Sequence, residues 1–157
     1  MTVTSVHKDP SSRTMTLTAE FTATAAGVWR LWSDPRRLER WWGPPTHPAT
    51  VVEHDLRPGG TVSYFVTGPD GTRSPGWWRV LAVDPPGRLE FELGDPGIPP
   101  LLVRVGITEQ AAGRTRMLVV TTFPDAGAMD RLLVMGYDRG LSAAVGQIDA
   151  VLTRPRP

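Results

Sequence analysis

The chain has 157 residues, the length of one domain, and folding at this length buries roughly 70% of the unfolded surface, so no disulfide or metal ion is needed to hold a core. It has no cysteine, which excludes disulfides and thiolate metal sites, and no stretch approaches the ~18 apolar residues that cross a bilayer, so a soluble, cytoplasmic protein with no membrane partner is expected. Lys and Arg total 17 against 16 Asp and Glu, a formal charge of +1 with no block of like charge, so nucleic acid is not an expected partner.

The first predicted element is a strand over residues 14–21, after a stretch, residues 1–12, that is expected to be flexible. The sequence TMTLTAEF alternates strictly, and its apolar face carries Met15, Leu17, Ala19 and Phe21. Two short helices are expected next. AAGVWRLWS follows Thr24, a suitable N-cap, and RRLERWW follows Asp34 and Pro35, a cap and first-turn pair.

Residues 50–122 predict six further antiparallel strands, because alternating segments are separated by Gly and Pro clusters. The segments are TVVEHDL, TVSYFVT, WWRVLAV, RLEFEL, LLVRVGIT and TRMLVVTT. Arg79 has the same parity as Leu81 and Val83, and an inward arginine would need a carboxylate or an anionic ligand. A bulge or an edge position is therefore expected in that strand. With the first strand, the predicted sheet has seven strands.

The C-terminal segment changes to a period of three to four residues, which predicts one long amphipathic helix. Its apolar residues include Met129, Leu132, Leu133, Tyr137, Leu141, Ala144, Val145, Ile148 and Leu152. Pro155 should end the helix, and residues 153–157 are expected to form a tail. Glycines 136, 140 and 146 each cost roughly 1 kcal/mol relative to alanine inside a helix. Either the helix approaches the sheet closely at these glycines, or they make room for a guest molecule.

The order strand, two short helices, six strands and long helix predicts an α+β domain. A twisted seven-stranded antiparallel sheet must bury one face, and only the long helix is large enough to cover it. The sheet is therefore expected to curve around that helix. If the wrap is loose, a cavity remains between sheet and helix, and such a cavity is an obvious ligand site.

Several segments in this order resemble one protein family. They are VWRLWSDPRRLERWWGP at 28–44, DLRPGG at 55–60, PDG at 69–71, VDPPGRLEF at 83–91, GRTRMLVVTT at 113–122 and MGYDRGL at 135–141. The chain is similar to proteins related to the activator of the heat-shock protein 90 ATPase, within the START-like (SRPBCC) superfamily of polyketide cyclases and birch-pollen allergens. The resemblance implies one helix-grip domain over residues 1–157, with a cavity between sheet and C-terminal helix. Members of the superfamily bind lipids, hormones and polyketides, some cyclise aromatic polyketides, and some sequester toxic natural products.

Strand parity selects candidate cavity residues. Tyr64 shares its face with Val62 and Val66, and His54 shares its face with Val52 and Leu56, so Tyr64 and His54 are candidate polar contacts. Further candidates complete the wall: Leu89, Phe91, Leu93, Val103, Val105, Ile107, Met117, Val119 and Thr121 from the sheet, and Tyr137, Leu141, Ala144, Val145 and Ile148 from the helix. Because a cavity wall and an ordinary core have the same composition, core packing is the alternative for each aliphatic residue.

Four tryptophans are further candidates. Trp41 and Trp42 end the second short helix, where they either cover a ligand or fasten the small helices onto the sheet. Trp77 and Trp78 are neighbours on a strand and point to opposite faces, so at most one of them lines the cavity. The other is exposed or joins an interface, and a homodimer is one expected outcome.

Three functions remain open from the sequence. The first is binding or sequestration of a small hydrophobic, aromatic molecule without turnover. The second is a cyclase-type enzyme in which His54, Tyr64 or Tyr137 assists proton transfer. The third is a chaperone-partner role with Trp77 or Trp78 as anchor. No residue is assigned as catalytic and no cofactor is expected, and the three histidines lack the spacing of a metal site.

Overall fold

The computed structural model describes residues 3–95 and 98–153 and has the predicted α+β architecture. The strands are β1 (Val3–Asp9), β2 (Thr14–Phe21), β3 (Ala49–His54), β4 (Thr61–Thr67), β5 (Arg73–Asp84), β6 (Arg88–Asp95), β7 (Ile98–Ala111) and β8 (Arg114–Thr122). The helices are α1 (Ala25–Ser33), α2 (Pro35–Leu38), α3 (Ala126–Val134), α4 (Tyr137–Val145) and α5 (Ile148–Thr153).

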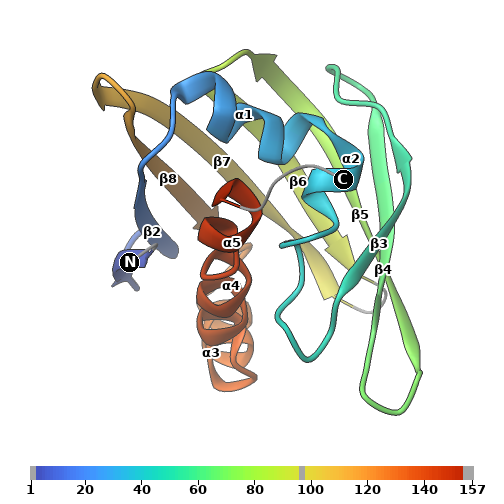
Figure 1. The fold of residues 1–157 in the computed structure, drawn as a ribbon. Coiled ribbons are helices and arrows are strands. Elements are labelled where there is room, and N and C mark those ends of the chain that lie inside the picture. The colour runs from blue at the N-terminus through green and yellow to red at the C-terminus, as the bar shows by residue number, and fades with distance from the viewer. Residues whose placement is uncertain (1–2, 96–97, 154–157) are drawn as a thin grey trace.

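The strands form one antiparallel sheet in the order β1-β2-β8-β7-β6-β5-β4-β3. Figure 1 shows this sheet curving around the helices, with α3, α4 and α5 in front of its concave face and α1 and α2 across one end. This is the helix-grip fold. In the described part of the chain, no helix is long and apolar enough to span a membrane.

The sheet has eight strands in the described residues, one more than predicted. The extra strand, β1, pairs with β2 inside the segment that was expected to be flexible. The turn between them is held by Asp9, whose carboxylate accepts hydrogen bonds from the backbone N–H and the hydroxyl of Ser11 at 3.1 and 2.7 Å. These bonds lower the pKa of Asp9. β1 was missed because VTSVHKD lies at an edge of the sheet and has only two apolar residues, too few for a recognisable alternation.

The C-terminal segment is helical as predicted, but it is divided into α3, α4 and α5 instead of forming one continuous helix. The first break lies at Gly136, which has a left-handed backbone with φ of 96°. The second lies at Gly146, the C-cap of α4. The three helices nevertheless follow one another almost along one line (Figure 1). Of the predicted tail, residue 153 is the last residue of α5, and residues 154–157, with Pro155, lie outside the described residues.

The second short helix is shorter than predicted. The side chain of Asp34 accepts a hydrogen bond from the Arg36 N–H at 3.0 Å, and Pro35 occupies the first turn, so α2 starts as expected. It ends at Leu38, and the following residues form a turn. Trp41 and Trp42 therefore lie just after α2, with both backbone N–H groups donating to the Leu38 carbonyl at 3.2 and 2.9 Å.

Two bulges set which side chains face inward. The register shifts between Val80 and Ala82 in β5, so a bulge is the one of the two expected alternatives that occurs: Arg79 and Leu81 are exposed on the outer face, whereas Val83 packs against the core. A second shift, between Val51 and Glu53 in β3, was not predicted. It buries Val51 and leaves Val52 64% exposed, so the inward position predicted for Val52 is wrong.

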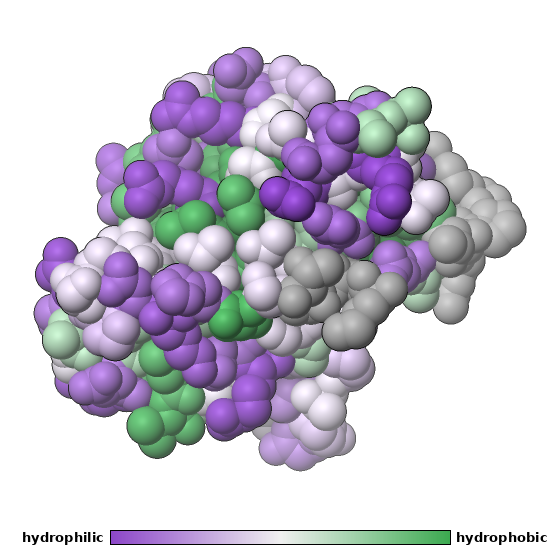
Figure 2. Space-filling view, turned by 90° about the vertical axis from the view of Figure 1, so that its left-hand side faces the viewer, coloured by the Kyte–Doolittle hydropathy of each residue, from purple (hydrophilic) through white to green (hydrophobic). Residues whose placement is uncertain are grey.

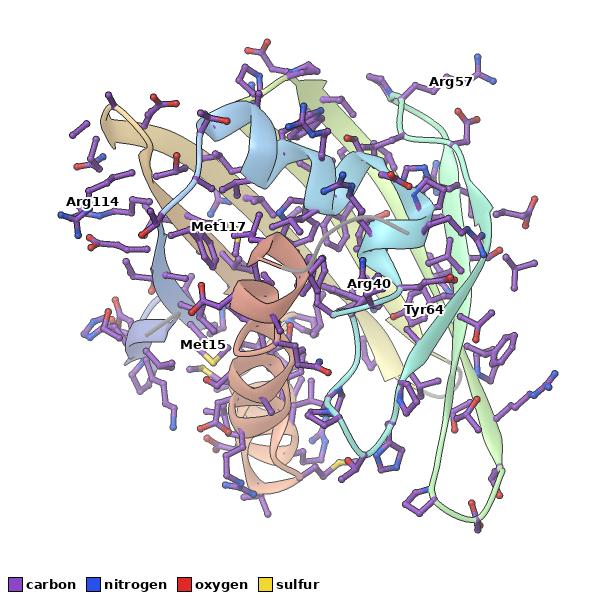
Figure 3. All side chains as sticks on the ribbon, viewed as in Figure 1. Met15, Arg40, Arg57, Tyr64, Arg114 and Met117 are labelled. Carbon is purple, nitrogen blue, oxygen red and sulfur yellow. The ribbon has the colours of Figure 1, made fainter. Side chains whose placement is uncertain are left out.

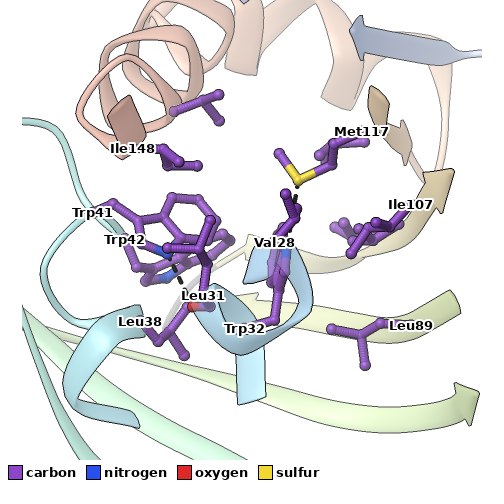
Figure 4. Packing of buried hydrophobic residues seen from close by; sticks show 14 of the residues in the cluster. Val28, Leu31, Trp32, Leu38, Trp41, Trp42, Leu89, Ile107, Met117 and Ile148 are labelled. Atoms are coloured by element: carbon purple, nitrogen blue, oxygen red, sulfur yellow. Dashed lines mark hydrogen bonds between the residues drawn. The ribbon is translucent and has the colours of Figure 1, made fainter. Parts of the chain in front are cut away.

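The main hydrophobic core contains an aromatic cluster on the inner side of the sheet. It consists of Trp32, Trp41, Trp42, Trp78 and Phe91. Trp78 stacks on Phe91 with ring centroids 4.0 Å apart. Figure 4 shows Trp32 donating from its indole nitrogen to the Met117 sulfur at 3.4 Å, and Trp41 donating to the Leu31 carbonyl at 3.0 Å. Each well-oriented ring pair adds about 0.5–1.5 kcal/mol beyond the burial of its surface.

At the β3 edge of the sheet, α2 and its C-cap Glu39 supply two of the hydrogen bonds that a neighbouring strand would make. The Glu39 carboxylate accepts from the Val51 N–H at 3.0 Å. The Arg36 guanidinium donates to the Val51 carbonyl at 3.1 Å and also pairs with Glu39. α2 is thus fastened to β3, which fixes the position of the turn that carries Trp42.

On the side of the molecule shown in Figure 2, hydrophobic residues lie in small separate groups among hydrophilic ones. Isolated apolar side chains of this kind are normal on a protein surface.

Candidate ligand-binding site

A cavity of about 250 Å³ lies between α4, the strands β4 to β6 and the turn that follows α2. Its lining is Trp42, Gly43, Pro44, Tyr64, Val66, Ser74, Pro75, Gly76, Leu93, Tyr137, Gly140, Leu141 and Ala144. The cavity therefore lies between sheet and C-terminal helices, at the place where a loose wrap of the sheet would leave one.

The sheet side of the cavity is built around Tyr64. Figure 3 shows Tyr64 on the side of β4 that faces the helices. Its register partner on β5 is Gly76, and a Cβ at Gly76 would lie 2.5 Å from the Tyr64 hydroxyl oxygen. Only a glycine leaves room for the phenol ring in this position. The ring of Trp42 meets Tyr64 edge to face at 6.1 Å, which joins the sheet side to the turn after α2.

The helix side of the cavity is one face of α4. Tyr137, Gly140, Leu141 and Ala144 follow the three-to-four-residue spacing that places side chains on the same side of a helix. A Cβ at Gly140 would have no other atom within 4 Å. The glycine thus leaves empty space where another residue would project into the cavity. This supports the interpretation that Gly140 makes room for a guest molecule.

Tyr137 brings a polar group to the helix side. Its hydroxyl and that of Thr121 on β8 share a hydrogen bond of 3.1 Å, and its ring meets Phe123 edge to face. Burial raises the pKa of Tyr137 to about 12, against a small opposing effect of the Thr121 hydrogen bond. The phenol therefore keeps its proton at neutral pH.

Gln147, between α4 and α5, ties two sides of the cavity together. Its amide Nε2 donates to the Gly43 carbonyl at 2.8 Å, and it lies 3.3 Å from the Trp41 carbonyl and 3.4 Å from the Ala144 carbonyl. Gly43 and Ala144 both line the cavity, whereas Gln147 does not. One side chain thus fixes the spacing between the turn after α2 and the end of α4.

Four of the predicted site residues meet at this cavity: Trp42, Tyr64, Tyr137 and Leu141. Of the further wall residues that were expected, Leu93 and Ala144 also line it, whereas Leu89, Val105, Ile107, Val119, Thr121 and Ile148 do not. The other predicted residues are Trp41, His54, Trp77, Trp78, Phe91, Val103, Met117 and Val145, and none of these lines the cavity.

Six of those eight residues are core residues. Trp41, Trp78, Phe91, Val103, Met117 and Val145 are each at most 1% exposed. His54 lies elsewhere, with its Nε2 3.0 Å from the Trp32 carbonyl, which fastens β3 to α1. Trp77 is 36% exposed on the outer face and lies over Gly94, so Trp78 is the inward member of the pair.

The cavity also uses residues that the sequence did not single out: Gly43, Pro44, Ser74, Pro75 and Gly76. Gly43 and Pro44 entered the sequence analysis only as the end of the segment 28–44 that resembles the family. Gly76 carried a usable signal, because a glycine inside a strand often marks a close approach of another group.

The described lining residues include no Asp, Glu, Lys, Arg or His. Across residues 3–95 and 98–153, no group of three or more His, Cys, Asp or Glu side chains could hold a metal ion. The cavity thus has aromatic and aliphatic walls with hydroxyl groups as its polar side chains.

Comparison with known proteins identifies the family. The family described as Activator of Hsp90 ATPase homolog 1-like protein matches residues 22–153, most of the chain. The chain belongs to this family. Among curated proteins, none matches significantly.

Solved structures of similar proteins agree with the fold of this Activator of Hsp90 ATPase homolog 1-like domain. Protein Ms6760 from Mycobacterium smegmatis is 44% identical, with 99% of each chain covered and a TM-score of 0.88. A protein from Arthrobacter aurescens is 40% identical over 98% of this chain and 94% of that one, with a TM-score of 0.94. CalU16 from Micromonospora echinospora is 19% identical over 94% and 82%, with a TM-score of 0.60, and shares the START-like fold.

Proposed function

We propose that this protein binds a small hydrophobic, aromatic molecule in the cavity between α4 and strands β4 to β6. The observation that supports this best is the cavity itself, about 250 Å³ with predominantly apolar walls, at the place where the helix-grip fold separates sheet from helix. Preformed apolar cavities with a few polar groups are the usual form of small-molecule sites.

The arrangement of rings favours an aromatic ligand. Trp42, Tyr64 and Tyr137 all line the cavity and offer ring faces and edges for stacked or edge-to-face contacts. The hydroxyls of Tyr137 and Ser74 are side-chain groups that could orient a polar substituent, and the neutral Tyr137 phenol imposes no charge on the ligand.

Binding without turnover is better supported than a cyclase activity. A general acid or base needs a side chain that exchanges a proton near neutral pH. Tyr137 holds its proton to about pH 12, and His54, the histidine considered for this role, hydrogen-bonds to α1 instead of lining the cavity. Neither of these two residues therefore supports proton transfer to a ligand in the cavity, which favours binding without turnover.

A protein partner is the second candidate, and the exposed ring of Trp77 favours it. Trp77 is on the outer face of the sheet, away from the cavity, and exposed tryptophans often anchor interfaces. Such a partner, including a second copy of this chain, would bind independently of the cavity.

The test is a titration of the purified protein with naphthalene-1-methanol, a neutral aromatic alcohol, in an isothermal titration calorimeter. Wild-type protein should bind one equivalent saturably. Gly140→Leu, which fills the cavity from α4, should weaken binding at least tenfold. Ala143→Leu adds the same side chain at an exposed position of the same helix and should bind like wild type.

The proposal would be overturned if the wild type showed no saturable binding of naphthalene-1-methanol, or if Gly140→Leu bound it with the affinity of the wild type. Association with another protein that survives Gly140→Leu would instead support the partner candidate.

A further inference from the structure

We propose that the aromatic cluster limits the ligand to about two fused rings, and that Trp42 is the residue that sets this limit. The inference rests on the proposed function of the cavity. It concerns which aromatic molecules fit, and it assigns a specificity-determining role to one side chain.

The volume gives the first argument. An engineered cavity of about 150 Å³ in another protein holds one benzene molecule. The cavity described above measures about 250 Å³, less than twice that volume. Two fused rings therefore fit inside it, whereas a four-ring system or a long acyl chain would have to remain partly in solvent or displace the wall.

The second argument is what lies behind the wall. The ring of Trp42 is 5.0 Å from that of Trp78 and 5.6 Å from that of Trp41, both edge to face. Trp78 in turn stacks on Phe91, and these rings are fully buried. The interior beyond Trp42 is therefore filled by aromatic side chains, so the cavity cannot extend further between sheet and helices.

Trp42 is the member of the cluster that the ligand would meet. It lines the cavity and is 8% exposed, whereas Trp32, Trp41, Trp78 and Phe91 are buried behind it and do not line it. Replacing Trp42 with a smaller side chain adds its volume directly to the cavity. Replacing Trp41 creates space on the far side of Trp42 instead.

The experiment compares two alcohols that differ in ring number, naphthalene-1-methanol and pyrene-1-methanol. Binding of naphthalene-1-methanol is measured by calorimetry. Binding of pyrene-1-methanol is measured at low concentration by the polarity-sensitive emission of pyrene. Wild-type protein should bind the naphthalene alcohol at least tenfold more tightly than the pyrene alcohol. Trp42→Leu should bind the pyrene alcohol at least tenfold more tightly than wild type does.

Trp41→Leu is the matched control, because it removes an adjacent ring of the same cluster without opening the cavity, and it should retain the wild-type preference. Circular dichroism and ¹H–¹⁵N spectra establish that both variants are folded. If Trp42→Leu does not fold, the wild-type comparison alone decides the size limit.

Equal wild-type affinity for both alcohols, with both weakened by Gly140→Leu, would overturn the size limit and leave the proposed function standing. A folded Trp42→Leu variant that gains no affinity for the pyrene alcohol would overturn the role of Trp42. Binding of neither alcohol would overturn the proposed function and the size limit together.

Discussion

Gly140 occupies the middle of α4, where alanine is the better helix former. Its Cβ position is empty, so an added methyl group meets no other atom. We expect Gly140→Ala to raise the free energy of unfolding by up to about 1 kcal/mol, because the unfolded chain loses flexibility and the helix gains a better former. The same methyl group projects into the cavity and should weaken binding of naphthalene-1-methanol. Urea unfolding and calorimetry measure the two effects.

The control for Gly140→Ala is a substitution in the same helix. Ala143→Gly, at an exposed position of α4, should lower the unfolding free energy by a similar amount and leave ligand affinity unchanged. If Gly140→Ala were more stable and bound the ligand as tightly as wild type, the empty space at residue 140 would have no part in binding.

At the residue scale, parity predicted the inward side of a strand better than it predicted contact with the cavity. It placed Tyr64 with Val62 and Val66, and it required Trp77 and Trp78 to face opposite sides, as they do. It could not separate Tyr64 at the cavity from Phe91 in the core, because both face inward. That difference depends on which strand lies opposite α4 and on where large side chains already fill the interior.

At the scale of elements, Gln147 connects the turn after α2 with the end of α4. Gln147→Ala removes the amide that donates to the Gly43 carbonyl. We expect the unfolding free energy to fall by about 1–3 kcal/mol, because partly buried carbonyl groups lose their donor. Affinity for naphthalene-1-methanol should fall as well, although Gln147 does not line the cavity, because two of its sides lose their fixed spacing.

Gln110→Ala is the control, because Gln110 is an exposed glutamine on β7. This variant should change neither the unfolding free energy nor the affinity for naphthalene-1-methanol. A Gln147→Ala variant that is less stable but binds the ligand with wild-type affinity would show that this side chain holds the fold without positioning the cavity.

The elements themselves could be predicted where local pattern and packing agree. β2 has strict alternation and lies in the sheet as expected, with four apolar residues buried. The C-terminal helix was predicted as continuous because its apolar period continues through Gly136 and Gly146, and periodicity does not detect a left-handed glycine. The bulge in β3 was missed because an extra residue in a strand depends on its partner, and a single strand gives no sign of it.

At the scale of the whole molecule, one ion pair joins the first strand to the C-terminal helices. Lys8, the only lysine, lies 2.8 Å from the Asp138 carboxylate at the start of α4. The hydrogen bond from Lys8 is the main reason that the pKa of Asp138 lies below its ordinary value. The pKa of Asp138 is lower in the folded state than in the unfolded state, so the ion pair stabilises the fold fully above the unfolded pKa of about 3.9. This stabilisation is lost as the pH falls through the lowered pKa of the folded state.

We therefore expect Lys8→Met to be less stable than wild type at pH 7, by about 0.2–1 kcal/mol, since Lys8 is partly exposed and solvent screens the pair. The difference should disappear at a pH below the lowered pKa of Asp138. Urea unfolding of both proteins across the acid range measures this. A difference that persists unchanged after Asp138 is protonated would mean that Lys8 stabilises by packing and not by charge.

The bonds from Glu39 and Arg36 to Val51 also affect how copies of this protein meet one another. An open sheet ends in two strands whose backbone groups can pair with a strand of another copy, which is a common route to aggregation. At β3 the N–H and carbonyl of Val51 are already occupied by side chains from the same chain. An incoming strand would first have to displace both, so the contact that fastens α2 also protects this edge against intermolecular strand pairing.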